Sequence, residues 1–168
     1  MDSLAVAIDT SHEAYKFKGE PRLDFERLKE IHALIPDVPL VLHGASTVIP
    51  EFVDKCNEYG GEIPGARGVP EDMITEAVKH GVCKVNIDTD LRLAMTAEIR
   101  KFMVENPAEF DPRKYLGPAR SAIKRRATGC AGWLSTTTWI AASAFSATIV
   151  ATTTDCIRKA LIDRKSVV

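Results

Sequence analysis

The sequence predicts an α/β domain built on a short parallel sheet with helices packed outside it. Three short apolar runs suited to buried strands recur, within residues 3–8, 38–46 and 82–90. Each run is followed by a loop and by a segment whose apolar residues have helical spacing. Strands that alternate with helices in this way are typical of parallel sheets, because each crossover returns the chain to the same end of the sheet.

Length and composition fit one soluble domain. The chain has 168 residues, of which 45% are hydrophobic and 27% charged, and this excludes collagen-like, coiled-coil and wholly disordered classes. With 22 basic and 23 acidic residues, no electrostatic field favours a nucleic acid or an anionic membrane, so a small-molecule partner is expected. The four cysteines form no C-x-x-C pair and the first residues do not resemble a secretory signal, which favours a reducing cytoplasm.

The first unit runs from the strand at residues 3–8 to a helix over residues 23–35. Asp24 is suited to cap the start of this helix, because its carboxylate can accept a hydrogen bond from a backbone N–H of the first turn. Pro36 is expected to end the helix directly after Ile35.

The second and third units follow the same pattern. After the apolar run at 38–46, Pro50 opens a helical segment that extends to about Asn57. An amphipathic helix over 70–81 then leads into the third strand, and a long helix follows from residue 90. The apolar residues of this last helix, including Met95 and Met103, are expected to pack against the wall formed by the sheet.

Polar side chains with useful chemistry follow each strand. His12 comes after the first strand, His43 ends the second, and Asn86 and Asp88 end the third. Because the carboxyl ends of parallel strands meet on one face, the two histidines are expected to lie side by side. Each histidine alone is more often structural, but two neutral imidazoles together suit zinc or a similar divalent metal.

A phosphate-binding cradle is expected beside these histidines. Lys16 follows His12 by four residues, and Gly-Ala-Ser follows His43. Backbone amides of such a turn, a hydroxyl group and an ammonium group are the groups that hold phosphate in proteins.

The chain changes character after Arg126. Residues 127–154 contain no charged side chain and are numerous enough to span a bilayer. They are rich in Ser and Thr and lack helical apolar spacing, so an atypical tail is the favoured interpretation. The expected organisation is therefore one domain over residues 1–126 and an atypical tail over residues 127–168.

Several long motifs, in this order and spacing, resemble one known family. SHEAYKFKG, LVLHGAS, GGEIPGARGVPEDM, KVNIDTDLRLA and FDPRKYLGPAR are similar to the second half of a class II, metal-dependent fructose-1,6-bisphosphate aldolase, over about residues 3–126. The resemblance implies a partial (β/α)8 TIM barrel, namely its last three strand-helix units, with C-terminal helices. A complete barrel needs about 200–250 residues, more than this chain contains.

The resemblance also implies an activity and the residues that serve it. The family cleaves fructose 1,6-bisphosphate reversibly into dihydroxyacetone phosphate and glyceraldehyde 3-phosphate, in glycolysis and gluconeogenesis, and is commonly oligomeric. His12 and His43 match two of its three zinc ligands, and Asn86 matches the side chain that orients the enediolate. A monovalent cation is a further family feature. Substrate-binding positions are matched by Lys16, Gly44, Ser46, Asp88, Thr89, Arg92, Asp111 and Arg113, the last three toward the far phosphate and partly across a subunit interface.

Some family features have no counterpart here. The third metal histidine and the aspartate that moves the proton lie on earlier strands of the family, so the isolated chain is expected to bind metal weakly and to catalyse little. Glu13 and Asp9 replace family glycines, and a carboxylate ~4 Å from a phosphate charge costs about 1–4 kcal/mol. Thr47 stands where the family more often has Gly or Ser.

Two alternatives remain open. A tagatose-bisphosphate aldolase shares these motifs and differs in how one hydroxyl stereocentre is recognised. The other alternative is a non-catalytic partial barrel that oligomerises through its open sheet edge, or that is tethered to a membrane through residues 127–154.

Overall fold

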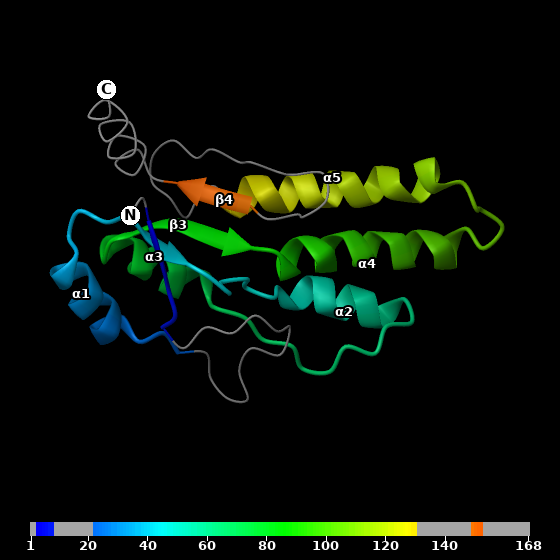
Figure 1. Cartoon of the computed structure of the whole chain (residues 1–168). Coiled ribbons are helices and arrows are strands. Elements are labelled where there is room, and N and C mark those ends of the chain that lie inside the picture. Colours follow the sequence, from blue (N-terminus) through cyan, green and yellow to red (C-terminus); the bar gives the residue numbers. More distant parts are fainter. Residues whose placement is uncertain (1–2, 9–21, 131–148, 153–168) are drawn as a thin grey trace, which may run out of the picture.

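The structure contains a sheet whose first three strands are parallel (Figure 1). The computed structural model describes residues 3–8, 22–130 and 149–152. The order of the strands in the sheet is their order in the chain, which confirms the parallel sheet expected from the alternating pattern. The strands are β1 (Leu4–Val6), β2 (Leu40–Leu42), β3 (Val82–Ile87) and β4 (Ile149–Thr152).

The register of the sheet aligns the carboxyl ends of the parallel strands. Leu42 pairs with Val6 on one side and with Val85 on the other. The fourth strand differs in direction, because β4 runs antiparallel to β3 with Ala151 opposite Val85. The sequence analysis did not foresee this strand, which lies in the segment expected to be an atypical tail.

Within the described ranges, helices connect or follow these strands, and local signals explain where the first of them begins and ends. The Asp24 carboxylate accepts a hydrogen bond from the Arg27 backbone N–H at 2.9 Å, and the helix stops at Ile35, directly before Pro36. The helices are α1 (Phe25–Leu34), α2 (Pro50–Glu58), α3 (Glu71–Lys79), α4 (Thr89–Glu105) and α5 (Pro112–Cys130).

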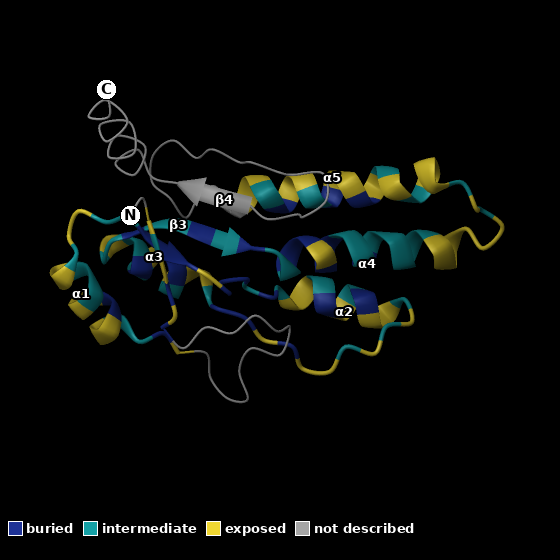
Figure 2. Cartoon of the chain, in the orientation of Figure 1, coloured by how far each residue is buried: buried dark blue, intermediate teal, exposed yellow. Residues whose placement is uncertain are grey.

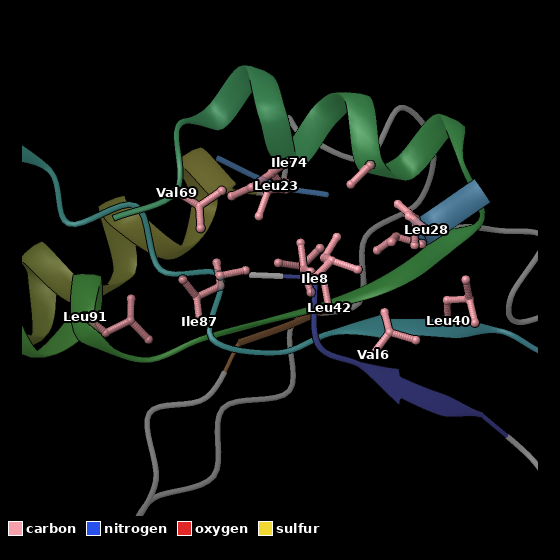
Figure 3. Close-up of a cluster of buried hydrophobic side chains, with 14 residues drawn as sticks. Val6, Ile8, Leu23, Leu28, Leu40, Leu42, Val69, Ile74, Ile87 and Leu91 are labelled. Carbon is pink, nitrogen blue, oxygen red and sulfur yellow. The ribbon is translucent and has the colours of Figure 1, made fainter. Parts of the chain in front are cut away.

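The main core lies between the sheet and the helices α1 and α3 (Figure 3). Leu40 and Leu42 of β2 are fully buried there, together with Leu28 from α1 and Ile74 from α3. All three residues of β2 are buried, as expected for the central strand of a parallel sheet covered on its faces. This core fixes the strand ends from which the candidate site extends.

The other helices form a separate layer beyond the carboxyl ends of the strands (Figure 1). Helix α4 continues in the direction of β3 and packs against α2 and α5. The expectation that its apolar residues pack on the sheet was therefore wrong for the far part of the helix, where Met103 is 37% exposed. Figure 2 shows exposed and half-buried residues along the end of α4 that is distant from the sheet. A second apolar cluster joins α2 to α4 through Val53, Cys56 and Ala97.

The segment after residue 126 is only partly described. Helix α5 extends across the expected domain boundary to Cys130, and residues 131–148 lie outside the described residues. Within the described part of the chain, no helix is both long and apolar enough to cross a membrane.

Candidate functional site

The centre of the candidate site is the loop that follows β2, over residues 43–48. Because Leu42 pairs with Val85 in a parallel register, the next residue along each strand, His43 and Asn86, stand at the same edge of the sheet. His43 is exposed and the following Gly44 is buried. Gly44 has φ of 67°, a left-handed conformation that glycine adopts without a steric penalty, so the chain turns sharply at the strand end.

Ser46 joins this loop to the start of α4. Its Oγ accepts hydrogen bonds from the backbone N–H groups of Asp88 and Thr89, both at 3.1 Å. These amides lie at the N-terminus of α4, where backbone N–H groups have no acceptor within the helix. Ser46 therefore caps α4 from a neighbouring loop. The two accepted bonds use both lone pairs of Oγ, and the hydroxyl retains one hydrogen to donate.

Asp88 and Arg92 form an ion pair on the outer side of the same helix start. The Arg92 Nε donates to Asp88 Oδ1 at 2.9 Å, and Arg92 Nη2 lies 2.6 Å from Asp88 Oδ2. The guanidinium group therefore offsets a carboxylate that would otherwise repel an anion beside Ser46. The structure thus brings together five of the expected site residues, namely Gly44, Ser46, Asp88, Thr89 and Arg92.

A buried carboxylate holds the far end of the loop. Asp90 is 0% exposed. Its Oδ2 accepts from the Thr47 backbone N–H at 2.9 Å and from Thr47 Oγ1 at 3.1 Å, and its Oδ1 accepts from the Val48 N–H at 2.6 Å. The guanidinium group of Arg126 in α5 lies beside this charge, with Nη2 3.6 Å from Asp90 Oδ2. The same group donates from Nη2 to Thr47 Oγ1 at 2.7 Å and from Nη1 to Glu71 Oε1 at 3.0 Å.

The loop contains one strained residue. Val48 has φ of 51°, a region that β-branched residues rarely occupy and that costs on the order of 1–3 kcal/mol. The hydrogen bond from its N–H to Asp90 and its burial beside Val53 and Ala66 are the interactions that offset this cost.

A glycine lies directly against the loop on its other side. The Val69 N–H donates to the Ser46 carbonyl oxygen at 3.0 Å. A Cβ atom at the preceding residue, Gly68, would lie 2.2 Å from that same oxygen. The segment 66–69 can approach this closely only because residue 68 has no side chain.

Asp111 and Arg113 are not part of this cluster. They lie at the start of α5, separated from Ser46 by the length of α4, about 25 Å for 17 residues at 1.5 Å each. Arg113 donates from Nη2 to Asp111 Oδ2 at 2.6 Å, and its side chain is 90% exposed. Hydrogen bonds from the side chain and the backbone of Arg113 lower the pKa of Asp111, and the same carboxylate raises the pKa of Arg113.

Of the two expected metal ligands, His43 lies within the described residues. His12 and Lys16 lie outside the described residues. Within the described ranges, no cluster of three or more His, Cys, Asp or Glu side chains is arranged to hold a metal ion. The exposed His43 imidazole is a donor that zinc prefers, and Asn86 Oδ1 is buried with no hydrogen-bond partner among the described residues. This donor chemistry fits a divalent metal with a polar ligand beside it.

Sequence reasoning missed three residues that shape the site: Asp90, Gly68 and Arg126. Asp90 stands in the motif NIDTD directly after two expected site residues, so its acidic character at the start of a helix was a visible signal. Gly68 lies in the quoted motif GGEIPGARGVPEDM. Arg126 had no local signal, because its partners lie 36 or more positions earlier in the chain.

Several known proteins are similar to this chain over most of its length. A fructose-bisphosphate aldolase from Stutzerimonas stutzeri is 55% identical over 127 residues, which cover 74% of this chain and 36% of that protein. A fructose-bisphosphate aldolase from Giardia intestinalis is 52% identical over 140 residues, covering 79% and 43%. One from Thermus caldophilus is 56% identical over 123 residues, covering 73% and 40%.

The chain thus spans about two fifths of the length of these curated relatives. The family model described as class-II fructose-bisphosphate aldolase matches residues 1–62 and 63–138. The match includes both strand ends that form the candidate site, and this chain belongs to the class II fructose-bisphosphate aldolase family.

Proposed function

We propose that this chain forms the triose-phosphate and metal-binding part of a zinc-dependent fructose-1,6-bisphosphate aldolase. The observation that carries the proposal is the contact between two loops at neighbouring strand ends. Ser46, from the loop after β2, hydrogen-bonds the first amides of α4, directly after β3. This contact unites the expected phosphate-binding residues, and relatives that are 55% and 52% identical to this chain are named fructose-bisphosphate aldolases.

In this proposal the loop binds the phosphate of dihydroxyacetone phosphate. The Ser46 hydroxyl has one hydrogen left to donate, and a phosphate oxygen is a suitable acceptor. Thr89 adds a second hydroxyl at the N-terminus of α4, where the helix dipole favours an anion. Arg92 keeps Asp88 paired, so the repulsion between that carboxylate and the phosphate is reduced.

The reacting end of the triose would lie beside His43 and Asn86. His43, together with His12, would hold the zinc ion, which acts as a Lewis acid toward the substrate carbonyl and hydroxyl oxygens when bound. The Asn86 side chain, whose Oδ1 is buried with no hydrogen-bond partner among the described residues, would orient the substrate through hydrogen bonds. Asp111 and Arg113 lie too far along α4 and α5 to share this pocket, and we propose that they serve the distant phosphate at a subunit interface.

Further parts of the proposal follow from the family. The three parallel strands would be part of the sheet of a partial TIM barrel. The protein would act in glycolysis and gluconeogenesis. It would be a cytoplasmic oligomer. A monovalent cation would accompany the phosphate.

Titration of the purified chain with Zn²⁺ and with dihydroxyacetone phosphate tests the proposal. We expect His43→Ala to weaken zinc binding at least tenfold. His80→Ala is the matched control, because His80 is paired with Glu76 on α3, away from the site. Equal zinc affinity of the two variants, or no binding of dihydroxyacetone phosphate by the unsubstituted chain, would refute the proposal. Cleavage of fructose 1,6-bisphosphate by the chain alone is expected to be slow, and a rate typical of the family would contradict the need for further residues.

A further inference from the structure

We propose that Asp90 is a positioning residue that fixes the conformation of the loop over residues 43–48. Its buried carboxylate accepts hydrogen bonds from the backbone N–H groups of Thr47 and Val48. The Thr47 hydroxyl links this carboxylate to Arg126, because it donates to Asp90 and accepts from Arg126. The part of this inference that concerns phosphate binding rests on the proposed function. The part that concerns the conformation of the loop rests on these hydrogen bonds alone.

Only a carboxylate satisfies the donors that meet at this point. Three donors from Thr47 and Val48 and one guanidinium group surround the two oxygens of Asp90. An ionised carboxylate accepts at every position, whereas an amide would direct an NH₂ group at one of these donors. The cost of such a mismatch is high here, because Asp90 is fully buried.

The Thr47 hydroxyl has a defined direction of donation. Arg126 Nη2 can only donate and lies 2.7 Å from Thr47 Oγ1, so the oxygen is the acceptor of that bond. The hydroxyl hydrogen is then directed at Asp90 Oδ2, 3.1 Å away. Thr47 therefore links α5 to α4 in one orientation.

The loop is consequently attached to α4 at two successive points. Ser46 binds the amides of Asp88 and Thr89, and the next two residues bind Asp90. If the Asp90 carboxylate were removed, the N–H of the strained Val48 would have no acceptor. The backbone would relax, and the Ser46 hydroxyl would move away from the position in which it faces a phosphate.

Hydrogen exchange of the Val48 amide tests the conformational part without any ligand. Thr47→Val removes only the hydroxyl, Thr47→Ser is the conservative variant that retains it, and Asp90→Asn alters the carboxylate. Ile74→Val is the control for a general loss of stability, because Ile74 is buried in the main core and takes no part in the hydrogen bonds that hold the loop to α4. We expect Thr47→Val and Asp90→Asn to accelerate hydrogen exchange of the Val48 amide at least tenfold more than Ile74→Val does.

Binding of dihydroxyacetone phosphate to the same variants tests the positioning role. Thr47→Val loses both hydrogen bonds of the Thr47 hydroxyl and should weaken the binding of dihydroxyacetone phosphate about tenfold. Thr47→Ser should retain most of the affinity. Exchange and affinity that change no more in Thr47→Val than in Ile74→Val would overturn the proposal, even if Asp90→Asn fails to fold. Faster exchange with unchanged affinity would overturn the positioning role. A chain that binds no dihydroxyacetone phosphate would refute the proposed function, and the exchange rates at Val48 would still decide whether Asp90 fixes the loop.

Discussion

Replacement of Gly68 by Ala should destabilise the protein through the loop of the candidate site. The added Cβ would lie 2.2 Å from the Ser46 carbonyl oxygen, whereas ordinary contact begins at 3.4 Å. The loop backbone must therefore move by about 1 Å, an overpacking that costs about 1–3 kcal/mol. The hydrogen bond from Val69 to Ser46 contributes a further net ~1 kcal/mol. We expect a total loss of about 3 kcal/mol, or a melting temperature about 6–12 °C lower for a chain of this size.

The same substitution at another glycine supplies the control. Gly117 lies in α5, and a Cβ there meets nothing within 4 Å. Gly117→Ala should leave stability nearly unchanged, because the better helix propensity of Ala is opposed by the steric restriction that Pro118 places on the residue before it. Thermal unfolding followed by circular dichroism measures both variants. If Gly68→Ala melts at the temperature of the unsubstituted chain, the close approach described for residues 66–69 is incorrect.

Three further outcomes are expected. Ser46→Ala leaves two α4 amides without their acceptor and should cost about 1–2 kcal/mol in urea unfolding; Ser121→Ala, at an exposed helix position, should cost less, and equal costs would argue against capping by Ser46. Burial raises the pKa of the Cys56 thiol above its usual 9.0, so above pH 9 the unfolded state loses its proton first and stability falls as the pH rises; Cys56→Ala should show a smaller fall between pH 8 and pH 10, and an identical slope would contradict this. Asp24→Ala should cost about 1 kcal/mol through the lost cap of α1, whereas Asp37→Ala, an exposed change outside the helices, should be nearly neutral in the same unfolding assay.

Elements governed by local signals could be predicted from the sequence. The apolar run around Leu42 and the helical spacing from Phe25 to Leu34 gave the first strands and α1 within a few residues. The cap at Asp24 and the stop before Pro36 also depend only on neighbouring residues. The strand ends then placed His43 and Asn86 at one edge, because parallel strands share their direction.

Features that depend on distant pairing could not be predicted in this way. Strand β4 forms through its register with β3, some 66 residues earlier (Ala151 against Val85). Three of its four residues are β-branched and favour a strand, but this composition does not say which strand they pair with. The contact of Arg126 with Asp90 joins residues 36 positions apart, and Arg126 looks like an ordinary helix-surface residue in the sequence. Helix α4 has apolar residues at helical spacing, but that spacing does not say whether they face the sheet or, as found, α2 and α5.

Strand β4 also affects how further strands could join this sheet. Its four residues, Ile149–Thr152, run against the direction of β3 and use the backbone groups that a parallel neighbour would bind. A closed ring of parallel strands therefore requires β4 to be displaced, and the free energy of its pairing opposes ring closure. Within the described residues, β1 is hydrogen-bonded to β2 alone.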